Sequence, residues 1–260
     1  MRPVLFEFAG LRVFGYGAAI AVGGMIAARI LWLRRSKAGL SDDLFWAFLN
    51  GLLIAGFAGG HLLYLLEYAR PGTEAFRRAV FSLSGGYSVF GGFIAVIAFV
   101  AVFARWKKIS FLRLADNVFW CAAFWHVWGR LGCFLAGCCY GTPTDFPLAV
   151  TFRDARALMP SGLLGVPLHP TQLYEMAGDV VIAGMLWGVL RSTDAGRWAP
   201  GLVAAGYLAA YGSLRFAVEF VRGDTLPLIG FLSAGQALSL TMLAVSGAIL
   251  VGRSRCTPSC

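Results

Sequence analysis

Seven stretches of mostly apolar residues constrain the fold of this chain more than any other feature of its sequence. Each is about twenty residues long, which as an α-helix is enough to cross the hydrocarbon core of a bilayer. The chain has 260 residues, of which 58% are hydrophobic and only 13% charged, so it is more apolar than a soluble domain. We therefore predict an all-α, multi-pass membrane protein with about seven transmembrane helices, forming one domain over residues 1–260. The predicted spans are residues 11–33, 44–68, 87–104, 114–135, 172–190, 199–221 and 231–252.

The charged residues indicate how these spans are oriented. Lysine and arginine number 22 against 13 aspartate and glutamate, a formal net charge of +9. The cations cluster after the first, third, fifth and seventh spans and form no stripe on a soluble fold, so nucleic acid is not an expected partner. Because cytoplasmic loops are enriched in lysine and arginine, we predict an external N-terminus and a cytoplasmic C-terminus. Residues 142–166 then form an external loop, a candidate gate or substrate platform. The cations that weigh against this orientation are Arg70, Arg77, Arg78, Arg153 and Arg156.

Charged side chains inside or beside the spans are the first candidates for a functional site, because an intramembrane charge is expensive. Arg130 lies near the predicted outer end of the fourth span. In the sixth span, Tyr211, Arg215 and Glu219 are spaced four apart and share one helix face. We expect Arg215 to pair with Glu219 across one helical turn. The fifth span carries a second polar face, made of Gln172, Glu175 and Asp179.

Two further stretches fall at the same predicted depth, near the external surface. They are Tyr16 in the first span and the glycine-rich residues 85–93, which open the third. Arginines held at headgroup depth suit a phosphate, because a guanidinium is a planar fork of donors that stays protonated. The polar residues therefore predict an outward-facing pocket for an anionic phospholipid.

Five motifs of the chain resemble, in order and spacing, those of the prolipoprotein diacylglyceryl transferases. The stretch "GRLGCFLAGCCYG" at 129–141 is similar to the signature of that family, Gly-Arg-x-Gly-Asn-Phe-x-Asn-Gly-Glu-x-x-Gly. The other four are Tyr16–Gly17, "GGYSVFGGF" at 85–93, "HPTQLYE" at 169–175 and "YGSLRFAVEFVR" at 211–222. The resemblance implies a seven-span enzyme of the bacterial cytoplasmic (inner) membrane whose active site faces the external side.

The resemblance also implies a reaction and a set of residues. The family transfers the diacylglyceryl group of phosphatidylglycerol to a cysteine thiol in the signal peptide of a preprolipoprotein, forming a thioether and releasing glycerol phosphate. The leaving phosphate gains charge, so cations are needed to stabilise it. The expected catalytic residues are Arg130, Arg215, Glu219, Tyr16 and His126. The expected substrate-binding residues are Gly91, Gly92, Gly141, His169, Gln172, Tyr174, Glu175, Tyr211 and Cys138. We expect a monomer without cofactor or metal ion, whose partners are phosphatidylglycerol, preprolipoprotein signal peptides and membrane lipids.

Several positions depart from the family pattern. In the signature, Cys133 and Ala136 replace the two Asn, and Cys138 replaces the Glu. Phe90 replaces the usual His of the third span, and His61 replaces an Arg often seen in the second. These changes remove the expected base and part of the headgroup site. His126 lies four residues before Arg130, on the same helix face, so our hypothesis is that its imidazole replaces the missing one.

Each functional interpretation has a structural alternative. For Arg130 the alternative is an ion pair with Glu175 or Asp179 that only holds helices together, and the motif match favours the functional interpretation. His126 lies among three tryptophans and is as suited to packing as to catalysis. The glycines of the third-span motif are typical of helix packing when taken alone. They are Gly85, Gly86, Gly91 and Gly92.

Cys133, Cys138 and Cys139 leave three interpretations open. The first is a disulfide or free structural thiols; neighbouring cysteines are strained when bridged, so Cys133 with one of the other two is the easier pair. The second is a part in the site, in place of the family's Asn and Glu. The third, a metal site, lacks a paired C-x-x-C spacing and a fourth ligand. The cluster also leaves open a membrane thiol–disulfide oxidoreductase using Cys138 and Cys139, or a non-catalytic phospholipid-binding protein.

Overall fold

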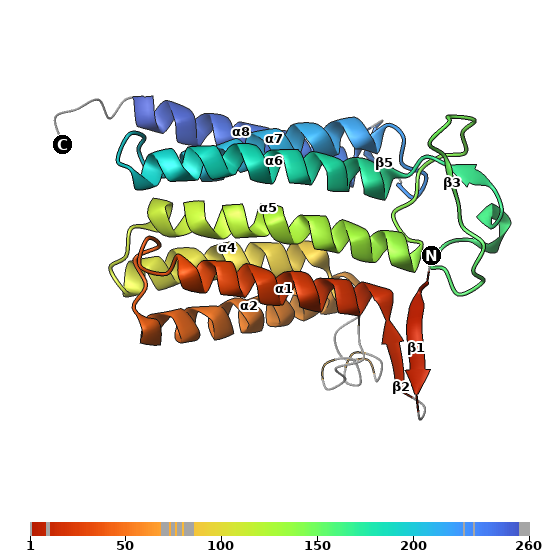
Figure 1. Ribbon diagram of the computed structural model, residues 1–260, viewed down its shortest axis with the longest axis horizontal. Helices are drawn as coiled ribbons and strands as arrows, with labels where there is room; N and C mark the ends of the chain where they lie inside the picture. Colours follow the sequence, from red (N-terminus) through yellow and green to blue (C-terminus); the bar gives the residue numbers. More distant parts are fainter. Residues whose placement is uncertain are drawn as a thin grey trace. The chain divides into compact units, whose positions relative to one another are not determined.

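Helices make up most of the computed structural model, which describes residues 2–8, 11–68, 73, 76, 80, 86–225, 227–230 and 232–254. Over these residues the chain folds into seven long α-helices, one short 3-10 helix and three two-stranded antiparallel sheets (Figure 1). Among the residues named above, those outside the described range are Arg70, Arg77, Arg78 and Gly85.

One helix overlaps each predicted span, although most helix ends differ from the predicted bounds by a few residues. The helices are α1 (Gly15–Leu33), α2 (Asp42–Tyr68), α4 (Val89–Trp106), α5 (Phe111–Ala136), α6 (Thr171–Asp194), α7 (Leu202–Glu219) and α8 (Ala234–Ser254). Five of them, α1, α2, α5, α6 and α8, are long and apolar enough to cross a membrane, and α4 has a shorter apolar run. The prediction of a helical, multi-pass membrane protein is confirmed. The number of seven crossings and the orientation of the termini stay predictions.

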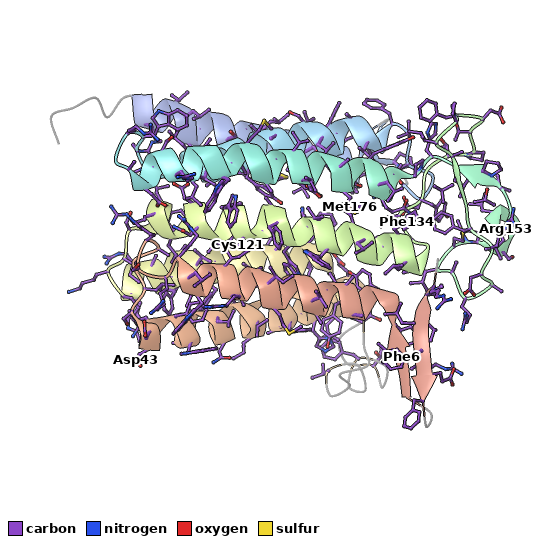
Figure 2. All side chains as sticks on the ribbon, in the orientation of Figure 1. Phe6, Asp43, Cys121, Phe134, Arg153 and Met176 are labelled. Atoms are coloured by element: carbon purple, nitrogen blue, oxygen red, sulfur yellow. The ribbon has the colours of Figure 1, made fainter. Side chains whose placement is uncertain are left out.

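The first helix begins later than the sequence predicts. Residues from 11 onward were expected in the first span, but Leu11–Phe14 forms strand β2, which pairs with β1 (Val4–Phe8). The physical reason is that the hairpin satisfies the backbone groups of these residues before the helix starts. Glu7 lies opposite Arg12, and Arg12 Nε lies 3.1 Å from Glu7 Oε1. Phe6 projects from β1 and is 58% exposed (Figure 2).

The chain divides into two compact units, which we call the smaller unit (residues 32–115) and the larger unit (residues 1–31 with 116–260). In the smaller unit α2 and α4 pack side by side (Figure 1). A Cβ placed on Gly91 of α4 would lie 2.3 Å from the carbonyl oxygen of Gly59 on α2. The two helix backbones therefore approach through their glycines, as in other membrane helix pairs.

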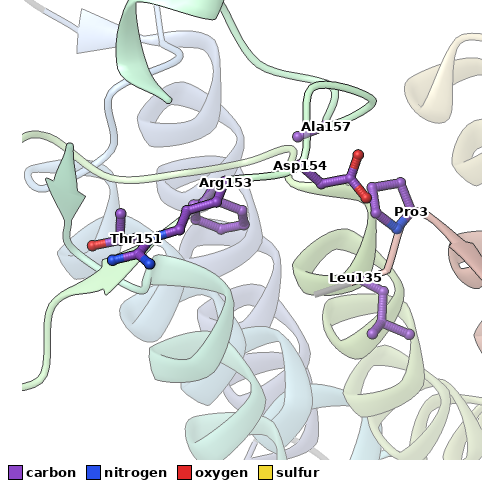
Figure 3. A pocket seen from close by; sticks show the side chains of 7 residues that line it. Pro3, Leu135, Thr151, Arg153, Asp154 and Ala157 are labelled. Atoms are coloured by element: carbon purple, nitrogen blue, oxygen red, sulfur yellow. The ribbon is translucent and has the colours of Figure 1, made fainter. Parts of the chain in front are cut away.

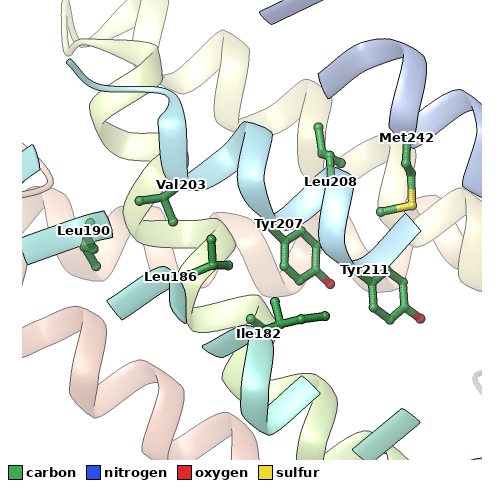
Figure 4. Close-up of a cluster of buried hydrophobic side chains, with 9 residues drawn as sticks. Ile182, Leu186, Leu190, Val203, Tyr207, Leu208, Tyr211 and Met242 are labelled. Carbon is green, nitrogen blue, oxygen red and sulfur yellow. The ribbon is translucent and has the colours of Figure 1, made fainter. Parts of the chain in front are cut away.

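In the larger unit, α6, α7 and α8 enclose an apolar core (Figure 4). Leu186 of α6 and Val203 of α7 are buried in it, and Met242 closes it from α8. Tyr207 and Tyr211, one turn apart on α7, stack with ring centroids 5.5 Å apart and an interplanar angle of 2°. Their hydroxyls point the same way, so the apolar core ends in a line of polar groups.

A buried carboxylate joins α5 to the start of α7. Asp116 Oδ2 accepts a hydrogen bond from the Gly201 amide at 2.6 Å, and Oδ1 accepts one from Ala204 at 3.0 Å. Gly201 has left-handed backbone, with φ of 101°. Because the first N–H groups of a helix have no partner within it, Asp116 satisfies donors that burial would otherwise leave unpaired.

The segment after α5, predicted as an external loop over 142–166, has a folded structure of its own. Strands β3 (Val150–Thr151) and β4 (Pro167–Leu168) pair, and the 3-10 helix η1 (Ser161–Leu163) lies between them in sequence. Its small apolar cluster consists of Tyr140, Phe152 and Leu168. Hydrogen bonds from Arg156 lower the pKa of Asp154 to about 2, so this surface pair stays charged at neutral pH.

We predict that Gly91→Ala destabilises the protein by about 1–3 kcal/mol, because the added methyl overpacks the contact with α2. The matched control is Gly188→Ala on α6, where an added Cβ meets nothing within 4 Å. Thermal unfolding in detergent measures both. Equal unfolding temperatures for the two variants would contradict the packing argument.

Candidate active site

Arg130 lies at the centre of the polar residues of the larger unit. Its Nη2 lies 2.5 Å from Glu175 Oε2 on α6 and donates a hydrogen bond of 3.1 Å to the Tyr211 hydroxyl on α7. The Glu175 side chain has no exposed surface, whereas Arg130 keeps 15%. The ion pair proposed from sequence as a structural alternative is therefore present, and it joins α5, α6 and α7. Both contacts use Nη2, so neither occupies Nε or Nη1 of the guanidinium.

The second ion pair lies on α7 and reaches α8. Arg215 pairs with Glu219 across one turn, as the spacing predicts. Glu219 Oε1 also accepts a hydrogen bond from the Ser233 hydroxyl at 2.5 Å. Ser233 ends strand β6 (Leu232–Ser233), which pairs with β5 (Pro227–Ile229), and precedes the first residue of α8. The Glu219 carboxylate therefore contacts the residue that directly precedes α8.

Arg222 links the two pairs. Its Nη1 lies 3.5 Å from Glu175 Oε1, its Nε lies 3.9 Å from Glu219 Oε2, and its outer face is held by Asp224 at 2.8 Å. The sequence analysis did not name Arg222 as a site residue. The sequence feature that could have indicated it is its position three residues after Glu219, at the end of the motif over residues 211–222.

Several buried polar atoms of this network have no hydrogen-bond partner among the described residues. Both Asp179 oxygens and Gln172 Oε1 are in this state. Asp179 and Gln172 are fully buried on α6, on the polar face predicted for them. Since buried polar groups are normally paired, these atoms give the site capacity to bind a polar molecule.

His126 lies beside the network, one turn before Arg130. Its Nδ1 is 3.0 Å from the Tyr207 hydroxyl, and its ring centroid is 4.6 Å from that of Tyr211. Tyr211 thus touches His126 on one side and Arg130 on the other. Tyr211 therefore lies between the His126 imidazole and the Arg130 guanidinium and contacts both.

The loop after α5 is held by the first residues of α6. Gln172 Nε2 donates to the carbonyl oxygen of Cys138 at 2.7 Å, and Thr171 Oγ1 donates to that of Cys139 at 2.6 Å. The side-chain amide nitrogen of Gln172, a residue predicted to bind substrate, therefore donates its hydrogen bond to the protein backbone. Thr171 was not predicted, and no sequence signal distinguishes it from an ordinary helix-start threonine.

Gly141, His169 and Tyr174 form the far side of this loop. A Cβ on Gly141 would lie 2.5 Å from the carbonyl oxygen of His169, so two backbone segments cross there. The Gly141 amide donates to that oxygen at 3.1 Å. His169 Nδ1 lies 3.2 Å from the Tyr174 hydroxyl. All three residues pack against protein here, and their predicted contacts with substrate stay predictions.

The three thiols of the signature lie close together. The sulfur atoms of Cys133, Cys138 and Cys139 are all within 4.8 Å of one another, and each is a free thiol. Tyr16 of α1 packs against Gly132, the residue before Cys133, with a separation of 3.1 Å to an ideal Cβ on Gly132. The predicted site residue Tyr16 therefore stands beside the cysteines.

The remaining predicted residues belong to the smaller unit. Gly91 and Gly92 pack against the α2 backbone, and a Cβ on Gly92 would lie 3.0 Å from the Gly56 carbonyl oxygen. His61 Nδ1 lies 3.4 Å from the Gly86 carbonyl oxygen. These contacts match the helix-packing alternative, and a part in substrate binding stays a prediction for Gly91 and Gly92.

A pocket of about 170 Å³ lies elsewhere in the larger unit (Figure 3). It is bounded by the opening hairpin, the end of α5 and the segment around β3, through residues such as Pro3, Leu135 and Arg153. None of the predicted site residues lines it. The pocket is therefore separate from the arginine network.

The fold and the site define an integral membrane protein of apolar helices, with a buried network of arginines and carboxylates that can hold an anionic group. The family model described as prolipoprotein diacylglyceryl transferase matches residues 3–252. The chain belongs to the prolipoprotein diacylglyceryl transferase family.

Individual relatives agree with the family model. The chain is 34% identical over 246 residues, 94% of its length and 95% of the relative's, to a phosphatidylglycerol–prolipoprotein diacylglyceryl transferase of Clostridium tetani. It is 31% identical to a second such protein of Clostridium perfringens, covering 96% of this chain and 94% of the relative. A relative so named from Bordetella bronchiseptica is 32% identical, with 97% and 95% covered. Neither the oxidoreductase nor the lipid-binding interpretation is favoured by these relatives.

We predict that Glu175→Gln destabilises the protein by about 3 kcal/mol, because it removes the buried counter-charge of Arg130 and Arg222. Chemical unfolding in detergent measures the change. The control Glu67→Gln alters an exposed carboxylate of α2 and is expected to have little effect. In a double-mutant cycle with Arg130→Gln, simple additivity of the two changes would contradict the pairing.

Proposed function

We propose that this chain transfers the diacylglyceryl group of phosphatidylglycerol to the lipobox cysteine of preprolipoproteins, forming a thioether. Membership of the family and the names of its relatives support the reaction. The observation that carries the proposal is the arginine network: Arg130 and Arg215 are each held by a buried carboxylate. Glutamates that fix the guanidiniums leave them charged and oriented for a phosphate.

The proposed reaction needs a cation where the phosphate leaves. The substrate sulfur forms a bond to the glyceryl carbon while the bond from that carbon to the phosphate oxygen breaks. The electron pair stays on oxygen, and glycerol phosphate is released. The ion pair with Glu175 and the hydrogen bond to Tyr211 both use Arg130 Nη2, so Nε and Nη1 are the donors we assign to the phosphate. Donors arranged before the reaction stabilise the growing charge without reorganising.

The other polar residues support the two arginines in this proposal. Glu219 orients Arg215, and Tyr211 and Tyr16 shape the site beside Arg130. Gln172 holds the carbonyl of Cys138 and so fixes the loop at the edge of the site. Glu175 sets the position of Arg130 and of Arg222 together.

The substrate thiol also has to lose a proton, because only a small fraction of a free thiol is ionised at neutral pH. We assign this step to His126, whose Nδ1 lies 3.0 Å from the Tyr207 hydroxyl, so Nε2 is the nitrogen that we assign to the thiol proton. Tyr207 then acts as a positioning residue, since it fixes the orientation of the imidazole ring.

The setting of the reaction follows from the family. We place the chain in the bacterial cytoplasmic membrane as a monomer, with the arginine network facing the external side, where phosphatidylglycerol and signal peptides meet it. The folded segment over 142–166 follows the signature directly and borders the Figure 3 pocket, so we propose it as the signal-peptide platform.

The first test is thioether formation on a synthetic lipobox peptide in phosphatidylglycerol micelles, followed by mass. Arg130→Lys and Arg215→Lys keep the charge but lose the fork, and we expect each to lower turnover by about 10²–10³-fold. The control is Arg197→Lys, an exposed cation between α6 and α7, which should retain activity.

No thioether from the unaltered protein would refute the proposed function. Lipid bound but never consumed would favour the non-catalytic alternative. Full activity in Arg130→Lys and Arg215→Lys would instead leave the transferase in place and remove the arginine fork from its mechanism.

We predict that His126→Ala lowers turnover by about 10²-fold or more, the range typical of a lost general base. Tyr207→Phe removes only the hydroxyl that holds the imidazole, so a smaller loss is expected. Turnover by initial rates, with lipid binding measured separately, distinguishes catalysis from folding. Undiminished turnover in His126→Ala would return His126 to a packing role.

A further inference from the structure

The three sulfur atoms after α5 form the one cluster of potential metal ligands found among the described residues. Cys133 lies in the last turn of α5, and Cys138 and Cys139 follow the helix end. All three sulfurs are within 4.8 Å of one another; those of Cys138 and Cys139 are partly accessible, whereas that of Cys133 is buried. Three sulfurs bound to one Zn²⁺ at about 2.3 Å in a tetrahedral arrangement would be about 3.8 Å apart. Small side-chain rotations therefore bring the cluster to metal-binding geometry.

The backbone that presents these thiols is fixed before any ligand arrives. Cys139 has a φ of 59°, a left-handed conformation that is uncommon for any residue other than glycine. Thr171 and Gln172 hold it in place by donating to the carbonyl oxygens of Cys139 and Cys138. In this conformation the Cys139 sulfur lies within 4.8 Å of the other two sulfurs. Strain maintained by neighbouring groups is typical of functional sites.

The charges around the cluster suit a set of anionic ligands. Cys139 interacts with the Arg222 guanidinium, and Arg130 interacts electrostatically with Cys133 and Cys139. Metal ligands are thiolates, and three of them around a divalent ion leave one negative charge. The two arginines offset that charge.

We propose that Cys133, Cys138 and Cys139 bind one thiophilic divalent metal ion, Zn²⁺, and leave its fourth coordination position open. Within the described part of the chain no fourth His, Cys, Asp or Glu joins the cluster. Three protein ligands with one open position are typical of catalytic zinc sites, whereas structural zinc sites have four. The sequence lacks the paired C-x-x-C spacing of common metal sites, but in the folded loop the Cys139 sulfur lies within 4.8 Å of that of Cys133.

The open position suits a further thiol, and this step rests on the proposed function. When bound, the ion would hold the lipobox sulfur as a thiolate, and the thiol proton would go to His126, the base assigned above. The lipobox sulfur then forms the bond to the glyceryl carbon, and the bond from carbon to phosphate oxygen breaks with the electron pair on oxygen. The ion keeps its charge throughout, so no oxidant or reductant is needed. Cys133 and Cys138 stand where the resembled signature has an amide and a carboxylate, and the ion would activate the thiol in their place.

The test uses Co²⁺ as the probe, because cobalt bound to thiolates gives a near-ultraviolet charge-transfer band that zinc lacks. The full-length protein in detergent, reduced and freed of metal, is titrated with Co²⁺ and then with Zn²⁺. We expect one Co²⁺ per chain, displaced by Zn²⁺, and loss of the band in Cys133→Ser, Cys138→Ser and Cys139→Ser. The control Cys121→Ser changes a buried thiol of α5 outside the cluster and keeps the band.

Absence of the band in the unaltered protein, or its survival in all three variants, would overturn the proposal. Alkylation and mass measurement count the free thiols, and a disulfide that re-forms in place of metal binding would also overturn it. For the open position, a lipobox peptide is compared with its Cys→Ser form. A shift of the cobalt band by the cysteine peptide alone is expected.

Activity then separates the two proposals. A band that responds to the peptide without thioether formation would leave the metal site standing and refute the transferase. Equal thioether formation by metal-free and zinc-loaded protein would leave the transferase standing and remove the ion from its mechanism.

Discussion

Charge compensation inside an apolar helix bundle is the constraint on which the larger unit depends. Glu175 has no exposed surface and contacts both Arg130 and Arg222, while Glu219 contacts Arg215 and Arg222. A buried charge without a partner destabilises a fold by several kcal/mol, so α5, α6 and α7 are stable only in the arrangement that brings these groups together. The same arrangement brings together the arginines to which we assign the phosphate in the proposed function.

The apolar core below this network supports it. Tyr207 and Tyr211 stack on α7. The Tyr207 hydroxyl contacts His126, and the Tyr211 hydroxyl contacts Arg130. Asp116 fixes the start of α7 from α5. The start and the middle of α7 are thus held by hydrogen bonds to α5, which limits the freedom of the side chains between them. A phosphate-binding site benefits from such rigidity, because its donors need no reorganisation.

The loop after α5 shows how a signature can change while its frame is kept. Gln172 and Thr171 hold the carbonyl groups of Cys138 and Cys139, and these contacts involve only the backbone of the two cysteines. The side chains at the loop are therefore free to differ from those of the resembled signature. In this chain they are thiols, and they gather at one point beside Arg222.

The sequence alone determined the class of fold and most of the polar groups. Long apolar runs predict membrane helices, and the four-residue spacing of Tyr211, Arg215 and Glu219 predicts their shared face. The sequence prediction was wrong at the first span, where residues 11–14 form a strand. The pairing of that strand with β1 depends on contacts that helical periodicity does not report. Only the tertiary structure decided that Arg222 bridges two carboxylates and that three thiols converge. Periodicity reports which face of one helix a residue occupies, whereas these contacts depend on how separate segments pack and on a left-handed turn at Cys139 that no local preference predicts.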